Sequence, residues 1–392
     1  MRRSTRHRLA VLTIATLAGL DLAAQDSLPA DTTRPAPAAA DEQPKVKVSG
    51  YASTAYTVST RFKPLPDASR QIVGRFYDRF HDQLTFNAVS VTVELPVATS
   101  RRSAGFKAQV IAGQNAALLH SSGLSFGDQG DIPQAFVTLN IPLEGGDDHW
   151  MQIKVGKMWT LMGVEVLDDP ANPNVSVGNQ FIYLENLTNE ALGLDFRFGS
   201  ALDVELRLMN GWDVVQETNR GKSVVARLGV TPSEKVGLGF LGFYGPEQAG
   251  TTGSKRYGGQ FVGTFKLAAP TTLYVQADYG TESHLLANDA TAAWWGIGAW
   301  LTQDLGAGFT LALRADYTDD QHGVRTSGVL GYPSAPGRRI GSTTATLNVK
   351  AWRGALVRPE LRYDFSNRKD YGAPANPGKD QFTVALGVAH VM

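Results

Sequence analysis

The clearest pattern of apolar and polar positions in this chain is a strict alternation near its end, from Ala355 to Phe365. One set of alternate positions is apolar: Val357, Leu361, Tyr363 and Phe365. The other set is charged: Arg358, Glu360, Arg362 and Asp364. A period of two indicates a β-strand. Charges of both signs opposite a wholly apolar face are typical of a membrane barrel, in which one face meets lipid and the other a water-filled lumen.

Similar segments follow one another from Lys45 to the end of the chain. They predict about sixteen strands, an even number within the range of single-chain bacterial barrels. The predicted strands are Lys45–Thr60, Asp82–Leu95, Ser103–Asn115, Asp131–Leu143, His149–Trp159, Glu190–Phe198, Leu202–Trp212, Ser223–Pro232, Lys235–Tyr244, Arg256–Leu267, Thr271–Thr281, Thr291–Gln303, Phe309–Asp319, Ser342–Trp352, Ala355–Ser366 and Asp380–Met392.

The lengths of the connections support a barrel. Every second connection is short, whereas the others include the long loops Arg61–His81, Thr160–Asn189 and Asp320–Gly341. Short periplasmic turns and long outer loops are the pattern of an outer-membrane barrel. A soluble secreted β protein, the alternative, has no reason to follow it. The predicted fold is therefore all-β: a single-chain transmembrane antiparallel β-barrel over residues 45–392.

Charged positions on the alternating strands are assigned to the lumen. A charge on the lipid face at mid-depth costs ~2–4 kcal/mol, so the charged face has to point inward. The mixed signs of these side chains predict a water-filled pore with weak ion selectivity. The predicted pore-lining residues are Lys154, Asp195, Arg197, Glu205, Arg207, Asp278, Arg314, Asp316, Arg358, Glu360, Arg362 and Asp364.

The third outer loop, Thr160–Asn189, is the longest connection and is rich in acids and amides. A loop of this length without structure of its own is uncommon unless it is functional. We expect it to fold into the lumen and to narrow the pore, with an acidic constriction facing lysine and arginine. One alternative is that the loop only packs on the rim, and another is that its oxygen-rich residues bind Ca²⁺. The spacing of these residues matches no metal-binding loop, so we expect no metal and no cofactor. The predicted constriction residues are Glu165, Asp168, Asp169, Asn172 and Asn174.

Composition excludes several classes of protein. The net charge of the 392 residues is +0, which gives no basic excess for nucleic acid. After the N-terminus, no stretch approaches the roughly 20 apolar residues of a transmembrane helix. The chain has no cysteine, so disulfides and thiolate metal sites are excluded.

The N-terminus predicts export. Four arginines within the first eight residues precede the apolar stretch Leu9–Leu20. This pattern indicates a secretory signal peptide at residues 1–24, the alternative being a cytosolic amphipathic helix. Residues 25–44 are rich in Ala, Pro, Asp and Thr and are predicted to form a flexible periplasmic tail.

Two motifs that resemble catalytic or cofactor sites lack the required context. Gly237–Gly242 matches GxGxxG but lies inside an apolar strand with no helix after it. Gly123–Gly127 matches the nucleophile elbow around Ser125, with His120 nearby, yet it falls in a predicted outer loop. Nothing in the sequence specifies the third group of a triad, so we predict that the protein is not an enzyme; a barrel lipase or protease is the alternative.

Several segments together resemble the OmpL-like β-barrel porin family of outer-membrane proteins, over most of the chain. They are Gly163–Glu165, Asn172–Asn174, Phe181 and Tyr183, Asn189–Leu194, Leu311–Tyr317 with Asp319, Asp320 and Gly323, and Val357–Asp364. The resemblance implies a bacterial outer-membrane barrel without catalytic residues that passes small hydrophilic solutes passively.

The partners implied by this resemblance are outer-membrane lipid, the solutes and the barrel assembly machinery. General porins of this size are often homotrimers, although the strands show no signature of an interface between copies. One departure is the end of the chain, Met392 preceded by His390, where outer-membrane barrels usually carry an aromatic residue. The alternative function is a barrel plugged by its loops that acts as a surface-binding or structural protein.

Overall fold

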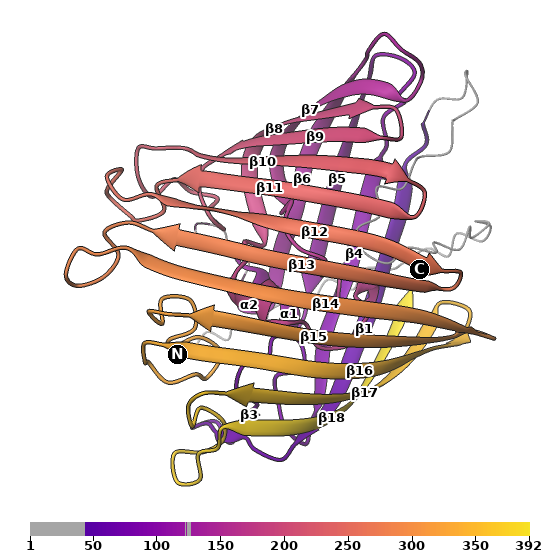
Figure 1. Cartoon of the computed structure of the whole chain (residues 1–392). Coiled ribbons are helices and arrows are strands. Elements are labelled where there is room, and N and C mark those ends of the chain that lie inside the picture. The colour runs from indigo at the N-terminus through magenta and orange to yellow at the C-terminus, as the bar shows by residue number, and fades with distance from the viewer. Residues whose placement is uncertain (1–43, 122, 124–126) are drawn as a thin grey trace, which may run out of the picture.

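The computed structural model describes residues 44–121, 123 and 127–392, and most of them form one closed antiparallel barrel (Figure 1). Within these residues sixteen strands make up the barrel, as predicted. The first strand, β1 (Lys47–Ser59), closes the ring by pairing with both β4 (Leu84–Leu95) and β18 (Asp380–Val391). Closure leaves no sheet edge, so each strand finds backbone partners on both sides.

The other barrel strands follow one another around the ring in sequence order. They are β5 (Ser103–Ala112), β6 (Gly130–Pro142), β7 (His149–Trp159), β8 (Thr188–Phe198), β9 (Leu202–Met209), β10 (Ser223–Ser233), β11 (Val236–Gly245), β12 (Arg256–Ala268), β13 (Thr271–Glu282), β14 (Ala292–Gly306), β15 (Phe309–Asp320), β16 (Arg338–Trp352) and β17 (Ala355–Ser366). The short strands β2 (Lys63–Pro64) and β3 (Arg70–Gln71) form a separate sheet in the first long loop.

The helices are short and lie in the long loops. They are α1 (Gln114–Leu119), a 3₁₀ turn at Asp169–Ala171 and α2 (Asn179–Tyr183). In the described part of the chain, no helix is long and apolar enough to cross a membrane.

Four predicted strand boundaries were wrong by three or more residues, and one of them is the end of β14, which runs to Gly306 instead of Gln303. The strand predicted to run to Asn115 stops at Ala112, because Gly113 has a φ of 123° and the chain then turns into α1. A methyl group at Gly113 would lie 2.6 Å from the carbonyl oxygen of Asn87, so only glycine fits this close approach. The strand β9 ends three residues before the predicted Trp212, and β16 begins at Arg338 instead of Ser342.

The connections alternate between two ends of the barrel, which we call the short-turn end and the long-loop end. At the short-turn end, Ala307 and Gly308 have φ values of 52° and 83°, the pattern of a type I′ hairpin turn. The short connections are 96–102, 143–148, 199–201, 234–235, 269–270, 307–308 and 353–354. The long ones are 60–83, 113–129, 160–187, 210–222, 246–255, 283–291, 321–337 and 367–379.

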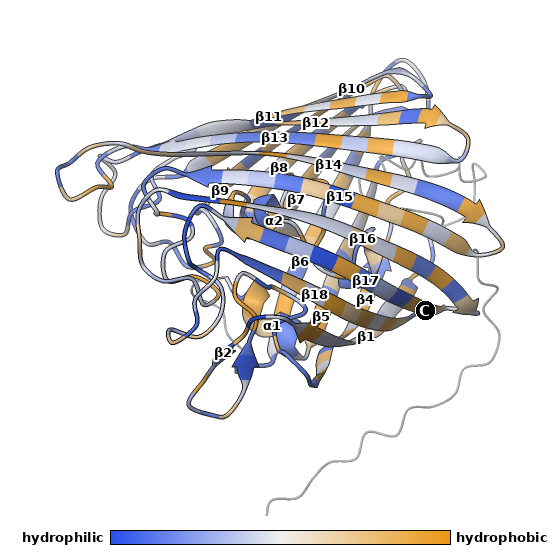
Figure 2. Cartoon of the chain, turned by 60° about the horizontal axis from the view of Figure 1, so that its bottom comes forward, coloured by the Kyte–Doolittle hydropathy of each residue, from blue (hydrophilic) through white to orange (hydrophobic). Residues whose placement is uncertain are grey.

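The two faces of the strands differ as the alternation predicts, and Figure 2 shows apolar and polar positions alternating along them. On β18, Phe382, Val384 and Leu386 are 39%, 48% and 44% exposed on the outer face. Ala385 and Ala389, on the inner face of the same strand, are 5% exposed. The outer surface is therefore apolar, and the polar positions meet inside the barrel.

Candidate functional site

Every residue predicted to line a pore belongs to the face of its strand that points into the barrel. Along β17, Arg358, Glu360, Arg362 and Asp364 are at most 3% exposed, whereas Leu361 and Tyr363 on the outer face are 50% and 41% exposed. Lys154, Arg197 and Glu205 are partly buried. The remaining predicted residues are buried: Asp195, Arg207, Asp278, Arg314 and Asp316. That they line an open pore stays a prediction.

The loop 160–187 lies against the inner wall made by β15, β16 and β17. Arg314 of β15 forms an ion pair of 2.7 Å with Glu165, and Nη1 of Arg362 donates to the carbonyl oxygen of Val177 at 2.6 Å. The carboxylate of Glu360 accepts from the backbone amides of Val175 and Ser176 at 2.6 and 3.1 Å. Because these bonds involve the loop backbone, the strand side chains fix the path of the loop.

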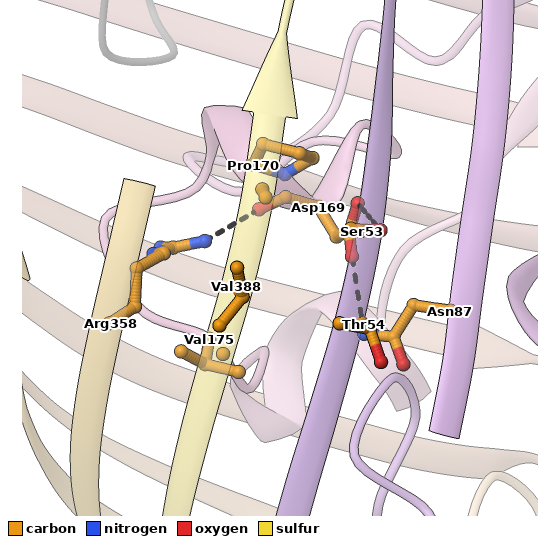
Figure 3. Close-up of a pocket in the computed structure, with 10 residues that line it drawn as sticks. Ser53, Thr54, Asn87, Asp169, Pro170, Val175, Arg358 and Val388 are labelled. Atoms are coloured by element: carbon orange, nitrogen blue, oxygen red, sulfur yellow. Dashed lines mark hydrogen bonds between the residues drawn. The ribbon is translucent and has the colours of Figure 1, made fainter. Parts of the chain in front are cut away.

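The acids and amides of this loop also bond to the wall or to the loop itself. Asp168 accepts from Gln109 of β5 at 2.7 Å, and Asp169 accepts from Ser53 of β1 at 3.0 Å. Arg358 donates to the carbonyl oxygen of Asp169, as Figure 3 shows around a cavity of about 10 Å³, room for about one water molecule.

The two asparagines complete this set. Asn174 donates to Thr346 of β16 at 2.7 Å, and the side chain of Asn172 bonds to the backbone of Val166. The side chains of the predicted constriction residues therefore all make contacts that hold the loop in place.

A second loop enters the interior, which the sequence did not indicate. Arg75, from the loop 60–83, forms ion pairs with Asp78 at 3.2 Å and with Asp364 of β17 at 3.3 Å. Phe76 packs edge-on against Phe181 of α2, with ring centroids 5.6 Å apart. The phenol of Tyr77 donates to the carbonyl oxygen of Leu167 at 2.8 Å. The first loop therefore packs against the third, and the two fill one side of the interior together.

The other side of the interior holds a cavity of about 420 Å³, bounded by β9, β10, β11 and β12. Ser233 at the end of β10 and Glu234 and Lys235 of the following turn belong to its lining, so it reaches the short-turn end. The loop contributes Thr160, Leu161, Met162, Gly163 and Val166 to this lining. Acids of the loop are missing from these lining residues, which differs from the expected acidic constriction.

A continuous ladder of ion pairs crosses the inner wall from β7 to β10 and ends at this cavity. Successive pairs join Lys154 to Asp195 (2.7 Å), Asp195 to Arg207 (2.6 Å), Arg207 to Glu205 (3.3 Å), Glu205 to Arg227 (2.9 Å), Arg227 to Asp203 (2.5 Å) and Asp203 to Arg197 (3.6 Å). Asp203 and Arg227 were not among the predicted pore-lining residues, although Asp203 alternates with apolar residues on a predicted strand and falls on the same inward face as Glu205 and Arg207. The ladder gives this wall charges of both signs.

Apolar side chains separate the cavity from the long-loop end. Met158, Met209, Leu241 and Phe243 from the wall pack with Met162 of the loop, and each is less than 10% exposed. Ala191, Trp212 and Val225 belong to the same cluster, with Phe136 and Leu161 packed against it. We call these residues the methionine cluster. It joins the loop to the wall that borders the cavity.

The motifs considered for catalysis and cofactor binding have no supporting geometry in the described residues. Gly237–Gly242 lies within β11, which is followed by a loop and another strand. His120 contacts the carbonyl oxygen of Gly130 at 2.8 Å, and Ser125 lies outside the described residues. Within the described residues, no three His, Asp or Glu side chains converge as metal ligands. The predicted signal peptide and all but the last residue of the predicted tail also lie outside the described part.

Comparisons with known proteins match this architecture. Residues 45–391 match the protein family described as "Putative beta-barrel porin-2, OmpL-like". Among solved structures, an anion-selective porin from Comamonas acidovorans superposes with a TM-score of 0.60 at 7% identity, over 89% of this chain and 99% of that one. No curated protein matches the chain.

Two further structures have the same fold. OmpF of Salmonella typhi, in a complex with daunomycin, gives a TM-score of 0.55 at 12% identity, over 89% of this chain and 98% of that one. OmpT of Vibrio cholerae, in a trimer form, gives 0.54 at 10% identity, over 90% and 100%. At these identities the likeness is one of fold, a barrel of the outer-membrane channel type.

Proposed function

The chain belongs to the OmpL-like beta-barrel porin-2 family, and we propose that it lets small hydrophilic solutes or ions diffuse passively through a barrel interior narrowed by the loop 160–187. The family and the fold are those of a channel in the bacterial outer membrane and not of an enzyme. Passive diffusion needs no catalytic residue, only a wetted path lined by polar groups.

One observation carries this proposal: the cavity of about 420 Å³ inside the closed barrel, with the ladder of ion pairs along one wall. Charged side chains at the cavity surface remain hydrated and favour a water-filled space over a collapsed one. The cavity also lies beside the loop, and not behind it, so a solute entering from the short-turn end passes Glu234 and Lys235 and then meets the loop at Leu161 and Met162. The methionine cluster is then the narrow part of the proposed path.

A plugged barrel with a surface-binding or structural role is the second candidate, and the same cluster favours it. Its eight buried members are at most 9% exposed and pack on one another, and the partly buried Phe136 and Leu161 pack against them. Apolar constrictions can close a pore by excluding water. In this reading the loop closes the barrel and the long-loop end presents a binding surface.

Single-channel recording in planar bilayers separates the two candidates. The sample is the full chain, folded in detergent and checked for heat-modifiable migration on gels. Steady current steps are expected for the open channel. Silence from protein that has demonstrably inserted would contradict passive diffusion and support the plugged barrel.

Deleting Asp168 to Val177 provides a second test. The deletion removes the backbone that Arg358, Glu360 and Arg362 hold, so the loop is expected to leave the wall and the conductance to rise. Unchanged conductance of a folded deletion variant would contradict a narrowing role for the loop. The deletion leaves Arg358, Glu360 and Arg362 buried without their partners in the loop. Folding therefore has to be checked by gel migration before recording.

We also propose assembly as a homotrimer in the outer membrane after insertion by the barrel assembly machinery. The support is a structurally similar barrel, OmpT of Vibrio cholerae, which is described in a trimer form. Light scattering of the folded protein, corrected for bound detergent, gives the mass directly. A mass equal to one chain would contradict the trimer.

A further inference from the structure

Arg227 of β10 has one half of its guanidinium group paired and the other half free. Its Nη1 donates to Asp203 and Glu205 at 2.5 and 2.9 Å. Its Nε and Nη2 have no hydrogen-bond partner in the described part of the chain, and the side chain is 21% exposed at the cavity. The two acids therefore fix the orientation of the group while its second edge stays available.

The free edge lies next to two glycines of the neighbouring strand β11, which pairs with β10. A methyl group at Gly239 of β11 would lie 3.6 Å from both Nε and Nη2 of Arg227. A methyl group at Gly237 would have no atom closer than 3.8 Å. Together the two glycines leave an open space in front of the edge, within the 420 Å³ cavity.

The rest of the cavity surface mixes apolar side chains with polar ones such as Thr231, Gln260 and Thr264. Leu161, Met162 and Val166 of the loop and Val262 of β12 contribute to the lining. The volume falls within the range of roughly 300–1,000 Å³ typical of small-molecule sites. A parallel pair of N–H donors matches the two oxygens of a planar carboxylate. The site thus offers one planar anion contact and an apolar surface for a short hydrocarbon body.

From this arrangement we propose that the free edge of Arg227 and the space over Gly237 and Gly239 bind small solutes that carry a single carboxylate and a compact apolar body. The negative charges of Asp203 and Glu205 on the paired side of Arg227 disfavour a dianion, so a monoanionic carboxylate fits better than phosphate. The inference deepens the proposed function, on which it rests, by naming a class of solute. The bound solute would lie just before the methionine cluster.

Binding is tested on the full chain, folded in detergent, by isothermal titration calorimetry with sodium benzoate and with benzamide, its neutral planar isostere. We expect benzoate to bind and benzamide to bind at least about tenfold more weakly, because only the anion pairs with the arginine edge. Single-channel conductance is recorded on the same preparation. A conducting protein that does not bind benzoate overturns this inference alone, whereas a silent protein that binds benzoate contradicts only the proposed passage.

Two variants locate the site. The variant Arg227→Gln should bind benzoate at least about tenfold more weakly. In this variant Asp203 still pairs with Arg197 and Glu205 with Arg207, so neither acid is left unpaired. Arg227→Lys keeps the charge but loses the bidentate edge, and an intermediate loss is expected.

A matched pair of glycine variants changes shape without changing charge. Gly239→Val fills the space in front of Arg227 and should weaken benzoate binding. Gly242→Val, on the outer face of the same strand where a methyl group has no atom within 3.8 Å, should leave binding unchanged. Equal binding by wild type, Arg227→Gln and Gly239→Val, or binding of benzamide or inorganic phosphate as tight as that of benzoate, would overturn the proposal.

Discussion

The charged residues inside the barrel fall into two groups according to their partners. Arg314, Arg358 and Arg362 donate to carbonyl or carboxylate oxygens of the loop 160–187. Lys154 and Arg207, by contrast, pair with Asp195 on the wall itself. The first group holds the loop, whereas the second belongs to the ladder of ion pairs, whose members Asp203, Glu205 and Arg227 border the cavity. Charged residues that occupy the same kind of alternating position in the sequence therefore have different roles. The path of the loop decides which role each one has.

Glu360 is predicted to be the strongest single anchor of the loop. Its carboxylate accepts from the amides of Val175 and Ser176 and from the hydroxyls of Ser176 and Thr346. Glu360→Ala leaves the two amides without acceptors in a buried place, at a cost of roughly 1–3 kcal/mol each. Hydrogen exchange of these amides is expected to accelerate at least about tenfold. Glu94→Ala, which removes a partly exposed pair with Lys107, is the control, and equal exchange in both variants would refute the anchoring role.

Asp213, in the loop 210–222, is predicted to make stability depend on pH. Burial raises the pKa of its carboxyl to about 6, although it accepts hydrogen bonds from the amides of Leu187 and Thr188 at 2.6 and 2.9 Å. Between the unfolded pKa of 3.8 and about 6 the folded state binds more protons, so this group lowers stability as pH rises through that window. Asp213→Asn keeps an acceptor oxygen and cannot ionise.

The measurement is the urea midpoint of wild type and of Asp213→Asn in lipid vesicles at pH 4 and pH 7. The stability of wild type relative to the variant should fall by roughly 1–3 kcal/mol between the two values, with allowance for the partial exposure of the side chain. Effects of all other titrating groups cancel in this difference. A difference that is constant with pH, or that changes in the opposite sense, would show that the carboxyl is not perturbed.

At the scale of elements, the strands were predictable and the loops were not. A strand such as β17 carries its own signal, because side chains alternate between lipid and interior whatever the neighbouring strand is. The sixteen strands and their antiparallel order followed from this local rule and from the lengths of the connections. The loop 160–187 depends instead on partners far along the chain: Asp169 bonds to Ser53 and lies beside Arg358. No periodicity records such contacts.

The loop 160–187 is bonded to the wall along one part and only packed against it along another. This difference predicts where the passage of solutes is controlled. Residues from Glu165 to Gln180 bond to the wall through charged and amide groups, whereas Leu161 and Met162 touch it only by apolar packing. Met162→Ala truncates the side chain between the cavity and the long-loop end and should raise single-channel conductance while the loop stays anchored. Met151→Ala, on the outer face of β7, is the matched control and should leave conductance unchanged. Unchanged conductance in Met162→Ala would place the narrow point elsewhere.

For the whole molecule, the arrangement of charge matters more than its total. The net charge of +0 predicted neither the clustering of charge inside the barrel nor its division by the loops. The sequence indicated an interior lined by charges of both signs, and the structure places those charges inward. The sequence indicated that acids of the loop 160–187 face arginines of the wall, as Glu165 faces Arg314, but not that the loop 60–83 joins it through pairs such as Arg75 with Asp364 and that the two neutralise one side. That division leaves the ladder between β7 and β10 as the main charged surface of the open side.

Ion selectivity is therefore predicted to be weak and set by the ladder. Its bases are Lys154, Arg197, Arg207 and Arg227, and its acids are Asp195, Asp203 and Glu205, so the bases exceed the acids by one. Pairs only 2.5–3.6 Å apart largely cancel for an ion in a wetted path, where screening acts over about 10 Å at 0.1 M salt. The reversal potential in a KCl gradient should show a slight preference for chloride, below about tenfold. Lys154→Gln makes the ladder neutral and should abolish that preference, whereas Lys107→Gln, which removes a pair with Glu94 outside the ladder, should not. A preference for either ion above about tenfold would mean that the ladder does not border the path the ions take.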